Sequence, residues 1–361
     1  MAKSLLKTSF LLLLVVLALL VTGCEGQLPA TGWPGLGATE GTTYAALGAK
    51  VYALDSDTGS LRWSFPISNT KKGEQFYAPP VESSQGQVFV GSFSDELYAV
   101  DAKSGEEKWS FPTKGAIIAG VAVGDETVYL GADDRKIHAL SAKDGSAKWQ
   151  FDMANWVWAT PVLAGDNLYV ASMDHHVYCL NAANGTKKWD FPAGGAVAGS
   201  PAISEGRVYF GDFDRKIYAL DAATGKEVWH VPTQHWVWGA VAVADNVVYA
   251  ADLSGKVYAL AAGRGEQVWQ FQASGAVRAD VLAHNGVVYV ASEKGLVYAL
   301  DAKSGQEKWH FAPEVAAKSG GFLAAPVLRE DVLYVVSSGG HVFAVNTTNG
   351  SEKWAFSPPQ G

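Results

Sequence analysis

One short segment recurs eight times along the chain, and this repetition constrains the fold more than any other feature. Its copies run from VYALDSDTGSLRWSF, which begins at Val51, to VFAVNTTNGSEKWAF, which begins at Val342. Each copy carries one tryptophan at the same position: Trp63, Trp109, Trp149, Trp189, Trp229, Trp269, Trp309 and Trp354. Six of the eight copies follow one another at a spacing of forty residues. Such a chain folds as an array of one structural unit.

Each unit has the pattern of a small antiparallel sheet. VYAL alternates and is rich in β-branched and aromatic residues, which indicates a strand. Asp221 is followed four residues later by Gly225, a pattern typical of a tight turn, and an alternating segment comes after it. A second pair of predicted strands lies upstream, as in SPAISEGRVYFG from Ser200. Each unit is therefore predicted to contain four strands.

A single four-stranded sheet cannot cover both of its faces, whereas eight sheets stacked around an axis can. We therefore predict an all-β fold, an eight-bladed β-propeller of four-stranded antiparallel blades. The repeated tryptophans are expected to fill the gaps between neighbouring blades. Seven blades are the alternative if the first unit, from Trp33 to Phe65, is incomplete.

The first residues have the features of an export signal. Lys3 and Lys7 precede an apolar run, Phe10 to Val21, that is too short to span a bilayer and has the size of a signal-peptide core. We expect residues 1–23 to be a lipoprotein signal peptide and residues 24–32 to be a lipidated cysteine with a short linker. Residues 33–361 are expected to form the propeller.

A cysteine follows this apolar run closely. Val21-Thr22-Gly23-Cys24 resembles the bacterial lipobox, in which small residues precede a cysteine that receives lipid. An acylated Cys24 would anchor the protein to a membrane without spanning it; an ordinary signal peptide with a chance cysteine is the alternative. The only other cysteine, Cys179, stands where sister segments have alanine. We expect it to be a small buried apolar residue, and no disulfide to form.

Charge and motifs argue against several functions. The formal net charge is −8 and no basic block occurs, whereas nucleic-acid binding needs a concentrated positive patch. HExxH, P-loop and GxSxG motifs are absent, so we expect no catalytic residues. His175-His176 is the only adjacent histidine pair, and Asp212 and Asp214 could share a cation. Neither pair supplies enough ligands to predict a metal site.

The repeated segment resembles a known motif. Ala53-x-Asp55-x-x-Thr58-Gly59-x-x-x-Trp63 and its copies are similar to the tryptophan-docking motif of the PQQ-type propellers, over nearly the whole mature chain. Within that superfamily, quinoprotein dehydrogenases bind pyrroloquinoline quinone and calcium on the propeller axis and usually carry adjacent cysteines there. BamB-type lipoproteins are cofactor-free scaffolds of the outer-membrane β-barrel assembly machinery. The size, the lipobox and the lack of adjacent cysteines resemble the second kind.

Two Trp-Val-Trp triplets mark one face of the predicted propeller. NWVWATPV begins at Asn155 and HWVWGAVAV at His235, each in a connection that leads into the innermost strand of a blade. Such connections share a face with the turns between second and third strands, which include FSDE, DDRK, MDHH and DFDRK. Because loops on a rigid scaffold and exposed aromatic residues favour binding, we predict a partner-binding face there. Its predicted residues are Trp156, Trp158, Trp236, Trp238, Arg278, Asp212, Asp214, Arg215 and His175.

An alternative is that the triplets only plug the inner ends of two blades, since most tryptophans are largely buried. The favoured function is a non-enzymatic lipoprotein scaffold that binds proteins, as in outer-membrane β-barrel assembly. We expect it to be exported, monomeric by itself and lipid-anchored, at the outer membrane facing the periplasm or otherwise at the cell surface. A PQQ-binding oxidoreductase with calcium is the rival from another class, and a small-ligand or sugar sensor is a third interpretation.

Overall fold

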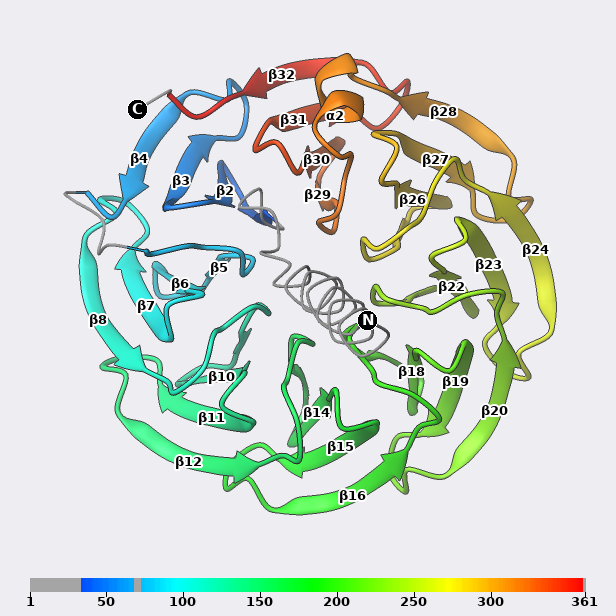
Figure 1. Cartoon of the computed structure of the whole chain (residues 1–361), viewed down its shortest axis with the longest axis horizontal. Helices are drawn as coiled ribbons and strands as arrows, with labels where there is room; N and C mark the ends of the chain where they lie inside the picture. The colour runs from blue at the N-terminus through cyan, green and yellow to red at the C-terminus, as the bar shows by residue number, and fades with distance from the viewer. Residues whose placement is uncertain (1–33, 68–72, 360–361) are drawn as a thin grey trace, which may run out of the picture. The chain divides into compact units, whose positions relative to one another are not determined.

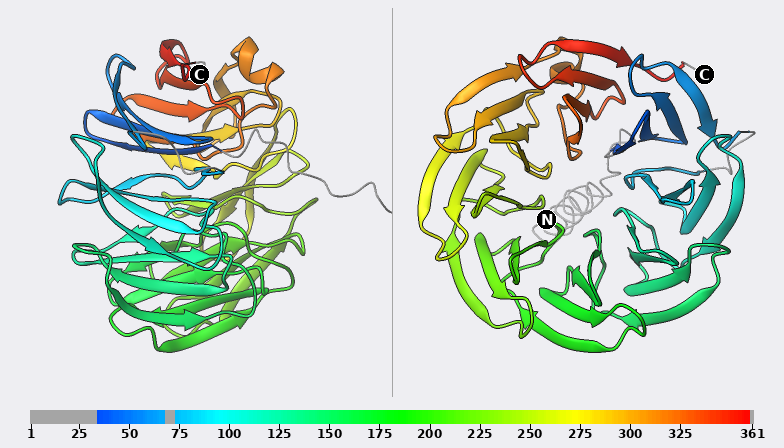
Figure 2. Two further views of the ribbon diagram at one scale, coloured as in Figure 1. Left: turned by 60° about the vertical axis from the view of Figure 1, so that its left-hand side comes forward. Right: turned by 180° about the vertical axis from the view of Figure 1, so that it is seen from behind.

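The computed structural model describes residues 34–67 and 73–359, and these form eight four-stranded antiparallel sheets arranged in a ring (Figure 1). Within each sheet the strands lie side by side in sequence order. Figure 2 shows the same ring from the side and from behind. The predicted eight-bladed β-propeller is confirmed, and the first blade is complete, so the seven-bladed alternative is wrong.

The strands of blades 1 to 4 are β1 (Gly35–Thr39), β2 (Thr42–Leu47), β3 (Lys50–Asp55), β4 (Leu61–Phe65), β5 (Val81–Glu82), β6 (Gln87–Gly91), β7 (Glu96–Asp101), β8 (Glu107–Pro112), β9 (Ala122–Val123), β10 (Thr127–Ala132), β11 (Lys136–Ser141), β12 (Ala147–Asp152), β13 (Val162–Ala164), β14 (Asn167–Ala171), β15 (His176–Asn181) and β16 (Lys187–Pro192). Those of blades 5 to 8 are β17 (Ala202–Ser204), β18 (Arg207–Gly211), β19 (Lys216–Asp221), β20 (Glu227–Pro232), β21 (Ala242–Ala244), β22 (Val247–Ala251), β23 (Lys256–Ala261), β24 (Gln267–Gln272), β25 (Leu282–His284), β26 (Val287–Ala291), β27 (Val297–Asp301), β28 (Glu307–Phe311), β29 (Val327–Arg329), β30 (Val332–Val336), β31 (Val342–Asn346) and β32 (Glu352–Phe356).

The predicted signal peptide (1–23) and the lipidated Cys24 with its linker (24–32) lie outside the described residues. Within the described ranges, no helix is both long and apolar enough to cross a membrane. A five-residue helix, α2 (Glu314–Lys318), lies in the connection between blades 7 and 8. The sequence repeats gave no signal for it, because this connection is longer than most of the others.

The turn between the third and fourth strands is built by the repeated Asp-x-x-Thr-Gly residues. In blade 5 the Asp221 carboxylate accepts hydrogen bonds from the backbone N–H and the hydroxyl of Thr224, at 2.8 and 2.7 Å. Gly225 has a φ of 69° and donates its N–H to the Asp221 carbonyl. A β-bulge follows in the register of β19 and β20, so that Trp229 pairs across from Ala219. The small alanine leaves room for the large ring opposite it.

Each repeated tryptophan joins its blade to the next. The Trp189 indole N–H donates to the Ala222 carbonyl of blade 5 at 3.0 Å. Its ring lies so close to Gly225 that a Cβ there would come within 2.6 Å of Trp189 Cδ2. Gly225 is therefore required twice, by its positive φ and by the ring that covers it. All eight repeated tryptophans make the corresponding indole bond to the following blade.

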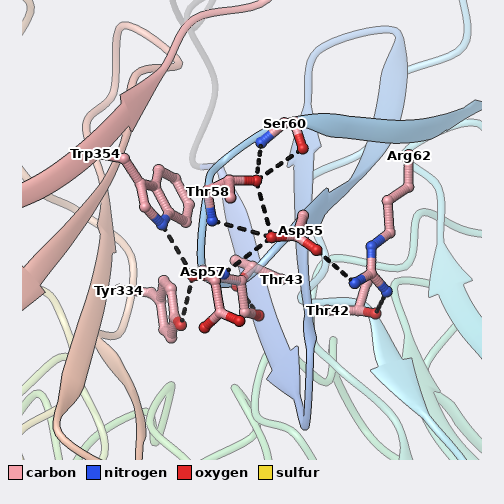
Figure 3. A network of polar contacts seen from close by, with 10 residues as sticks. Thr42, Thr43, Asp55, Asp57, Thr58, Ser60, Arg62, Tyr334 and Trp354 are labelled. Atoms are coloured by element: carbon pink, nitrogen blue, oxygen red, sulfur yellow. Dashed lines mark hydrogen bonds and ion pairs between the residues drawn. The ribbon is translucent and has the colours of Figure 1, made fainter.

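The ring is closed by the same contact, and in Figure 1 the blue first blade lies beside the red last blade. Trp354 of β32 donates to the Ser56 carbonyl of blade 1 at 2.9 Å, and Tyr334 donates to the same oxygen at 3.2 Å (Figure 3). The turn that receives them is held by Asp55, whose pKa is lowered to about 2 mainly by its hydrogen bond with Arg62. A contact between residues 298 positions apart thus completes the propeller.

The hydrophobic core is divided into eight parts, each between two adjacent blades. Cys179 is buried in the part between blades 4 and 5, as expected from its alanine-like position. Burial raises the pKa of its thiol, so it remains protonated and unreactive near neutral pH. Because these cores lie between the blades, the amino-acid sequence of the loops at both ends of the blades can differ from blade to blade.

The two ends of the blades form distinct faces. Connections between blades and turns between second and third strands share one face, which we name the connection face. Backbone hydrogen bonds join these two kinds of loop, for example from Phe213 N–H to the Ala196 carbonyl at 2.9 Å. The Asp-x-x-Thr-Gly turns lie on the opposite face.

Loss of the closing tryptophan should destabilise the whole ring. Trp354→Ala removes a ring and a hydrogen bond from the interface between the first and last blades. We expect it to lower the free energy of unfolding by about 3–5 kcal/mol, the usual cost of truncating a buried tryptophan. Trp354→Phe, which keeps most of the apolar contact, should cost about 1 kcal/mol through the lost hydrogen bond.

Urea unfolding followed by circular dichroism measures the free energy of unfolding of both variants. The control is Trp229→Ala, which truncates the equivalent tryptophan between blades 5 and 6. An unfolding midpoint for Trp354→Ala equal to that of the unmodified protein would contradict closure through this contact.

Candidate functional site

The two Trp-Val-Trp triplets lie on the connection face, as predicted. Val157 and Val237 are fully buried, whereas Trp156 and Trp236 are 45% and 43% exposed. Trp158 and Trp238 are half-buried and point toward the propeller axis, where they line a cavity. The triplets precede the innermost strands β13 and β21 and are not part of them. The alternative in which they only plug the blades is wrong for Trp156 and Trp236.

Five aromatic rings from three loops form a continuous cluster, which we name the aromatic cluster. It consists of Trp156, Trp158, Trp238, Phe213 and Trp236, in order of contact. Trp156 and Trp158 stack at a centroid distance of 5.7 Å, and Trp158 lies 6.3 Å from Trp238. Phe213 then stacks on both Trp238 and Trp236, at 5.0 and 5.1 Å.

A small residue leaves room for the contact between the two Trp-Val-Trp triplets. Ala198 occupies, in the connection to blade 5, the position that Trp158 and Trp238 occupy in the connections on either side. All three residues line the same axial cavity, and Ala198 itself is buried. A bulky side chain at this position would fill the space across which Trp158 and Trp238 approach each other.

Charged groups fix the two half-buried rings of the cluster. The Trp158 indole N–H donates to the Asp133 carboxylate at 2.9 Å. The Arg278 guanidinium lies 4.8 Å from the centre of the Trp238 ring, a cation–π contact. Arg278 is in turn held by an ion pair with Glu293. These partners restrict the rings before anything binds to them, which lowers the entropic cost of binding.

Asp133 carries a perturbed carboxyl group. Burial raises its pKa, its hydrogen bond from Trp158 opposes that shift, and the nearby charges of Asp95 and Asp134 raise the pKa further. The net effect disfavours the ionised form in the folded protein.

Of the remaining predicted residues, three are exposed and one, Asp212, is buried. His175 and Arg215 occupy equivalent turn positions, with φ values of 70° and 63°, and both are exposed on the connection face. Asp214 is exposed and forms an ion pair with Lys216 at 2.5 Å, which lowers the pKa of its carboxyl group. These three residues lie in turns beside the aromatic cluster.

Asp212 is not at the surface, so its prediction as a partner-binding residue is wrong. Its side chain is completely buried and accepts hydrogen bonds from the backbone N–H groups of Gly195 and Lys216, at 3.0 and 2.9 Å. It thereby ties the connection of blade 5 to the turn of the same blade. Asp252 plays the same part in blade 6, accepting from the N–H of His235. Both carboxylate oxygens of Asp212 are therefore used by backbone N–H groups of its own blade.

The axial cavity has a volume of about 150 Å³. Trp158, Trp238, Arg278 and Asp280 are among its lining residues. Asp280 accepts the Ala240 N–H at 2.7 Å, and burial raises the pKa of its carboxyl group. Pockets for drug-sized ligands usually measure about 300–1,000 Å³. The axial cavity is smaller than that range.

A calcium ion takes about six to eight oxygen ligands. Among the described residues, no group of three or more His, Cys, Asp or Glu side chains is arranged to hold a metal ion.

A family model described as outer membrane protein assembly factor BamB matches residues 47–155, 149–235 and 214–358. The chain belongs to the BamB family. None of the curated protein sequences is significantly similar to this family member.

Two solved structures share the fold of this BamB family member. BamB from Moraxella catarrhalis is 18% identical with a TM-score of 0.74, over 85% of this chain and 94% of that one. The computationally designed Ika8 protein is 16% identical with a TM-score of 0.76, over 86% of this chain and 95% of that one. At these identities, the likeness establishes the propeller fold alone.

Four residues of the site were not predicted: Phe213, Asp133, Glu293 and Asp280. Phe213 and Asp133 stand at the same position of the turns between second and third strands, where sister turns have Phe93 and Met173. That shared position was the available signal for Phe213. No sequence pattern shows that Glu293 would meet Arg278, because their contact depends on how a connection folds over a turn.

The raised pKa of Asp133 gives a testable pH dependence. A carboxyl group whose pKa is higher in the folded than in the unfolded state weakens stability above its ordinary pKa of about 4 and has no effect well below it. Asp133→Asn keeps an acceptor for Trp158 without the charge. We therefore expect Asp133→Asn to equal the unmodified protein in thermal stability at pH 3 and to match or exceed it at pH 7.

Asp133→Ala is the control, because it removes the acceptor and leaves the Trp158 N–H without this partner. It should lower the thermal midpoint at pH 7 and shift the tryptophan fluorescence. Thermal melts between pH 3 and 8 measure all three proteins. A lower midpoint for Asp133→Asn than for the unmodified protein only at high pH would contradict the raised pKa.

Proposed function

We propose that this protein is a non-enzymatic, lipid-anchored scaffold that binds other proteins through the aromatic cluster of its connection face. Membership of the BamB family supports a role in the assembly of outer-membrane β-barrel proteins. The observation that carries the proposal is the pair of exposed rings, Trp156 and Trp236, at the two ends of a cluster that is already ordered.

The chemistry of the cluster suits a protein interface. Tryptophan and arginine are the residues most enriched among those that dominate binding energy, and they act best when surrounding groups exclude water. Trp156 and Trp236 present apolar edges, while Asp214, Arg215 and His175 supply a polar rim. An aromatic centre with a charged rim is the usual composition of such an interface.

The proposed location follows from the N-terminal sequence. Residues 1–23 would direct export, and lipid on Cys24 would hold the protein at a membrane. In a bacterium with two membranes, the protein would be anchored to the outer membrane and face the periplasm; otherwise it would lie at the cell surface. The protein is proposed to be monomeric by itself and to work without a cofactor.

Removal of the two exposed rings should abolish partner capture. We expect the double variant Trp156→Ala, Trp236→Ala to bind its partner at least about 100-fold more weakly, since each anchor of this kind contributes roughly 2 kcal/mol or more. Affinity capture of the membrane-extracted full chain, with mass spectrometry, measures the loss. The matched control is Val228→Ala with Val268→Ala, which removes two equally exposed apolar side chains from outer strands.

Equal capture by both double variants would contradict binding through the aromatic cluster. An absorbance spectrum of the same sample separates the rival function. A quinone spectrum with dye-linked dehydrogenase activity would replace the scaffold with an oxidoreductase.

The anchor is tested by Cys24→Ser. We expect the unmodified protein to be recovered in the membrane fraction and to incorporate radioactive fatty acid, and Cys24→Ser to do neither. A Cys24→Ser protein that still incorporates fatty acid would contradict lipidation at this residue.

A further inference from the structure

Blade 3 departs from the repeat at one buried position of its third strand. The other seven blades have a larger aromatic ring at this position: Tyr52, Tyr98, Tyr178, Tyr218, Tyr258, Tyr298 and Phe343. Blade 3 has His138, in β11, and this side chain is buried as well. Because an imidazole is shorter than a phenol, the substitution leaves space on the outer side of the blade.

That space belongs to a pocket between blades 2 and 3. The pocket has a volume of about 370 Å³, which lies within the range of about 300–1,000 Å³ that is usual for small-molecule sites. Its lining comes from the end of β8 and the residues that follow it, from β11 and from β12, which are neighbours in Figure 1. It shares no lining residue with the axial cavity. The pocket is therefore distinct from the site that the aromatic cluster forms.

A buried hydrogen bond orients His138. Its Nε2 lies 2.9 Å from Asp134 Oδ2, and the two side chains are only 8% and 5% exposed. Burial opposes ionisation of Asp134, but the hydrogen bond and the charge of His138 lower the pKa of this carboxyl group overall. Since an ionised carboxylate only accepts hydrogen bonds, Nε2 carries a hydrogen and donates it. In blade 4 the Tyr178 hydroxyl donates to Asp174 in the same way, at 3.0 Å.

The second ring nitrogen of His138 opens into the pocket. Nδ1 has no hydrogen-bond partner among the described residues. The buried side-chain atoms that lack a partner in this part of the chain are Glu74 Oε1 and Ser292 Oγ, and Nδ1 is not one of them. Nδ1 is therefore accessible through the pocket, while the bond at Nε2 holds the ring in place.

Other polar groups of the pocket have unused donors. Lys114 and Gln150 are exposed, and neither side chain forms a hydrogen bond or an ion pair with another described residue. Lys136, which pairs with Asp152, and Lys148 also line the pocket. Three lysines and a single carboxylate make the lining positive in a chain whose formal net charge is −8. This charge favours an anionic ligand.

We propose that this pocket binds a small molecule that carries a phosphate group, with the phosphate held by His138 Nδ1 and Lys114. Lysine binds phosphate as a compact point charge, whereas a carboxylate is best matched by the paired N–H groups of arginine, which is absent from the lining. A phosphate group has a second pKa of about 6, so it presents either an O–H or an ionised oxygen to Nδ1. The neutral ring accepts the first and the protonated ring donates to the second.

The rest of the pocket suits the carbon skeleton of such a molecule. Phe111 and Pro112, at the end of β8, supply apolar surface beside the charged groups. The exposed Gln150 amide supplies a further donor for a hydroxyl group or for a phosphate oxygen.

Equilibrium dialysis with radioactive inorganic phosphate tests the site. The detergent-extracted, full-length protein is dialysed against the labelled phosphate at constant ionic strength. We expect saturable binding at a single site per chain, displaced by glycerol 3-phosphate but not by glycerol or by acetate at the same concentration. Binding that does not saturate, or displacement by acetate as effective as that by glycerol 3-phosphate, would overturn the proposal.

His138→Tyr is the most informative variant, because it restores the residue that most of the sister blades have and should leave the thermal midpoint unchanged. Its ring would fill the pocket, and its hydroxyl would bind Asp134 as Tyr178 binds Asp174. We expect it to bind phosphate at least about tenfold more weakly, since a hydrogen bond to a charged group is lost.

Lys114→Ala provides a second variant at an exposed position, where truncation does not disturb the fold. It should also weaken phosphate binding by about tenfold. Its matched control is Lys303→Ala, which removes an exposed lysine from a turn of the opposite face and should leave binding unchanged. Unchanged binding in His138→Tyr or in Lys114→Ala, or an equal loss in Lys303→Ala, would overturn the proposal. The pocket contains no residue of the aromatic cluster, so this experiment does not bear on the proposed scaffold function.

Discussion

The structure depends on one repeated contact, in which a tryptophan ring lies on the glycine of the next blade's turn and its N–H binds a carbonyl of that turn. Trp189 on Gly225 is one example, and Trp354 on Gly59 closes the ring. Because this contact and the eight cores hold the blades together, the connection loops contribute little to the stability of the fold. Their sequences can therefore differ from blade to blade, which is where the aromatic cluster arises.

The aromatic cluster gives the connection face of this rigid propeller an ordered aromatic centre. Trp158 and Trp238 approach each other across Ala198, and Phe213 extends the stack to Trp236. Asp133 and Arg278 fix the two half-buried rings, so the exposed rings at the ends are already positioned. The proposed protein-binding role rests on membership of the BamB family and on these exposed rings.

The sequence was sufficient for the fold and for the face on which the triplets lie, because both follow from the repeat. It was insufficient where a side chain's direction depends on a local turn. Asp212 is predicted at the surface from its place in the turn DFDRK, but its carboxylate points inward and accepts hydrogen bonds from two backbone N–H groups. Phe213, its neighbour, points outward and was missed. The contact between Trp158 and Asp133 has no signal in the sequence either, because it joins loops of different blades.

The most direct test of the central claim is photo-crosslinking in living cells from a benzoylphenylalanine placed at single positions. Residue 236 lies in the aromatic cluster, and residue 224 lies in the equivalent exposed turn of the opposite face. Binding through the connection face predicts a crosslink to a discrete protein from position 236 and none from position 224. Crosslinks from position 224 alone would contradict it.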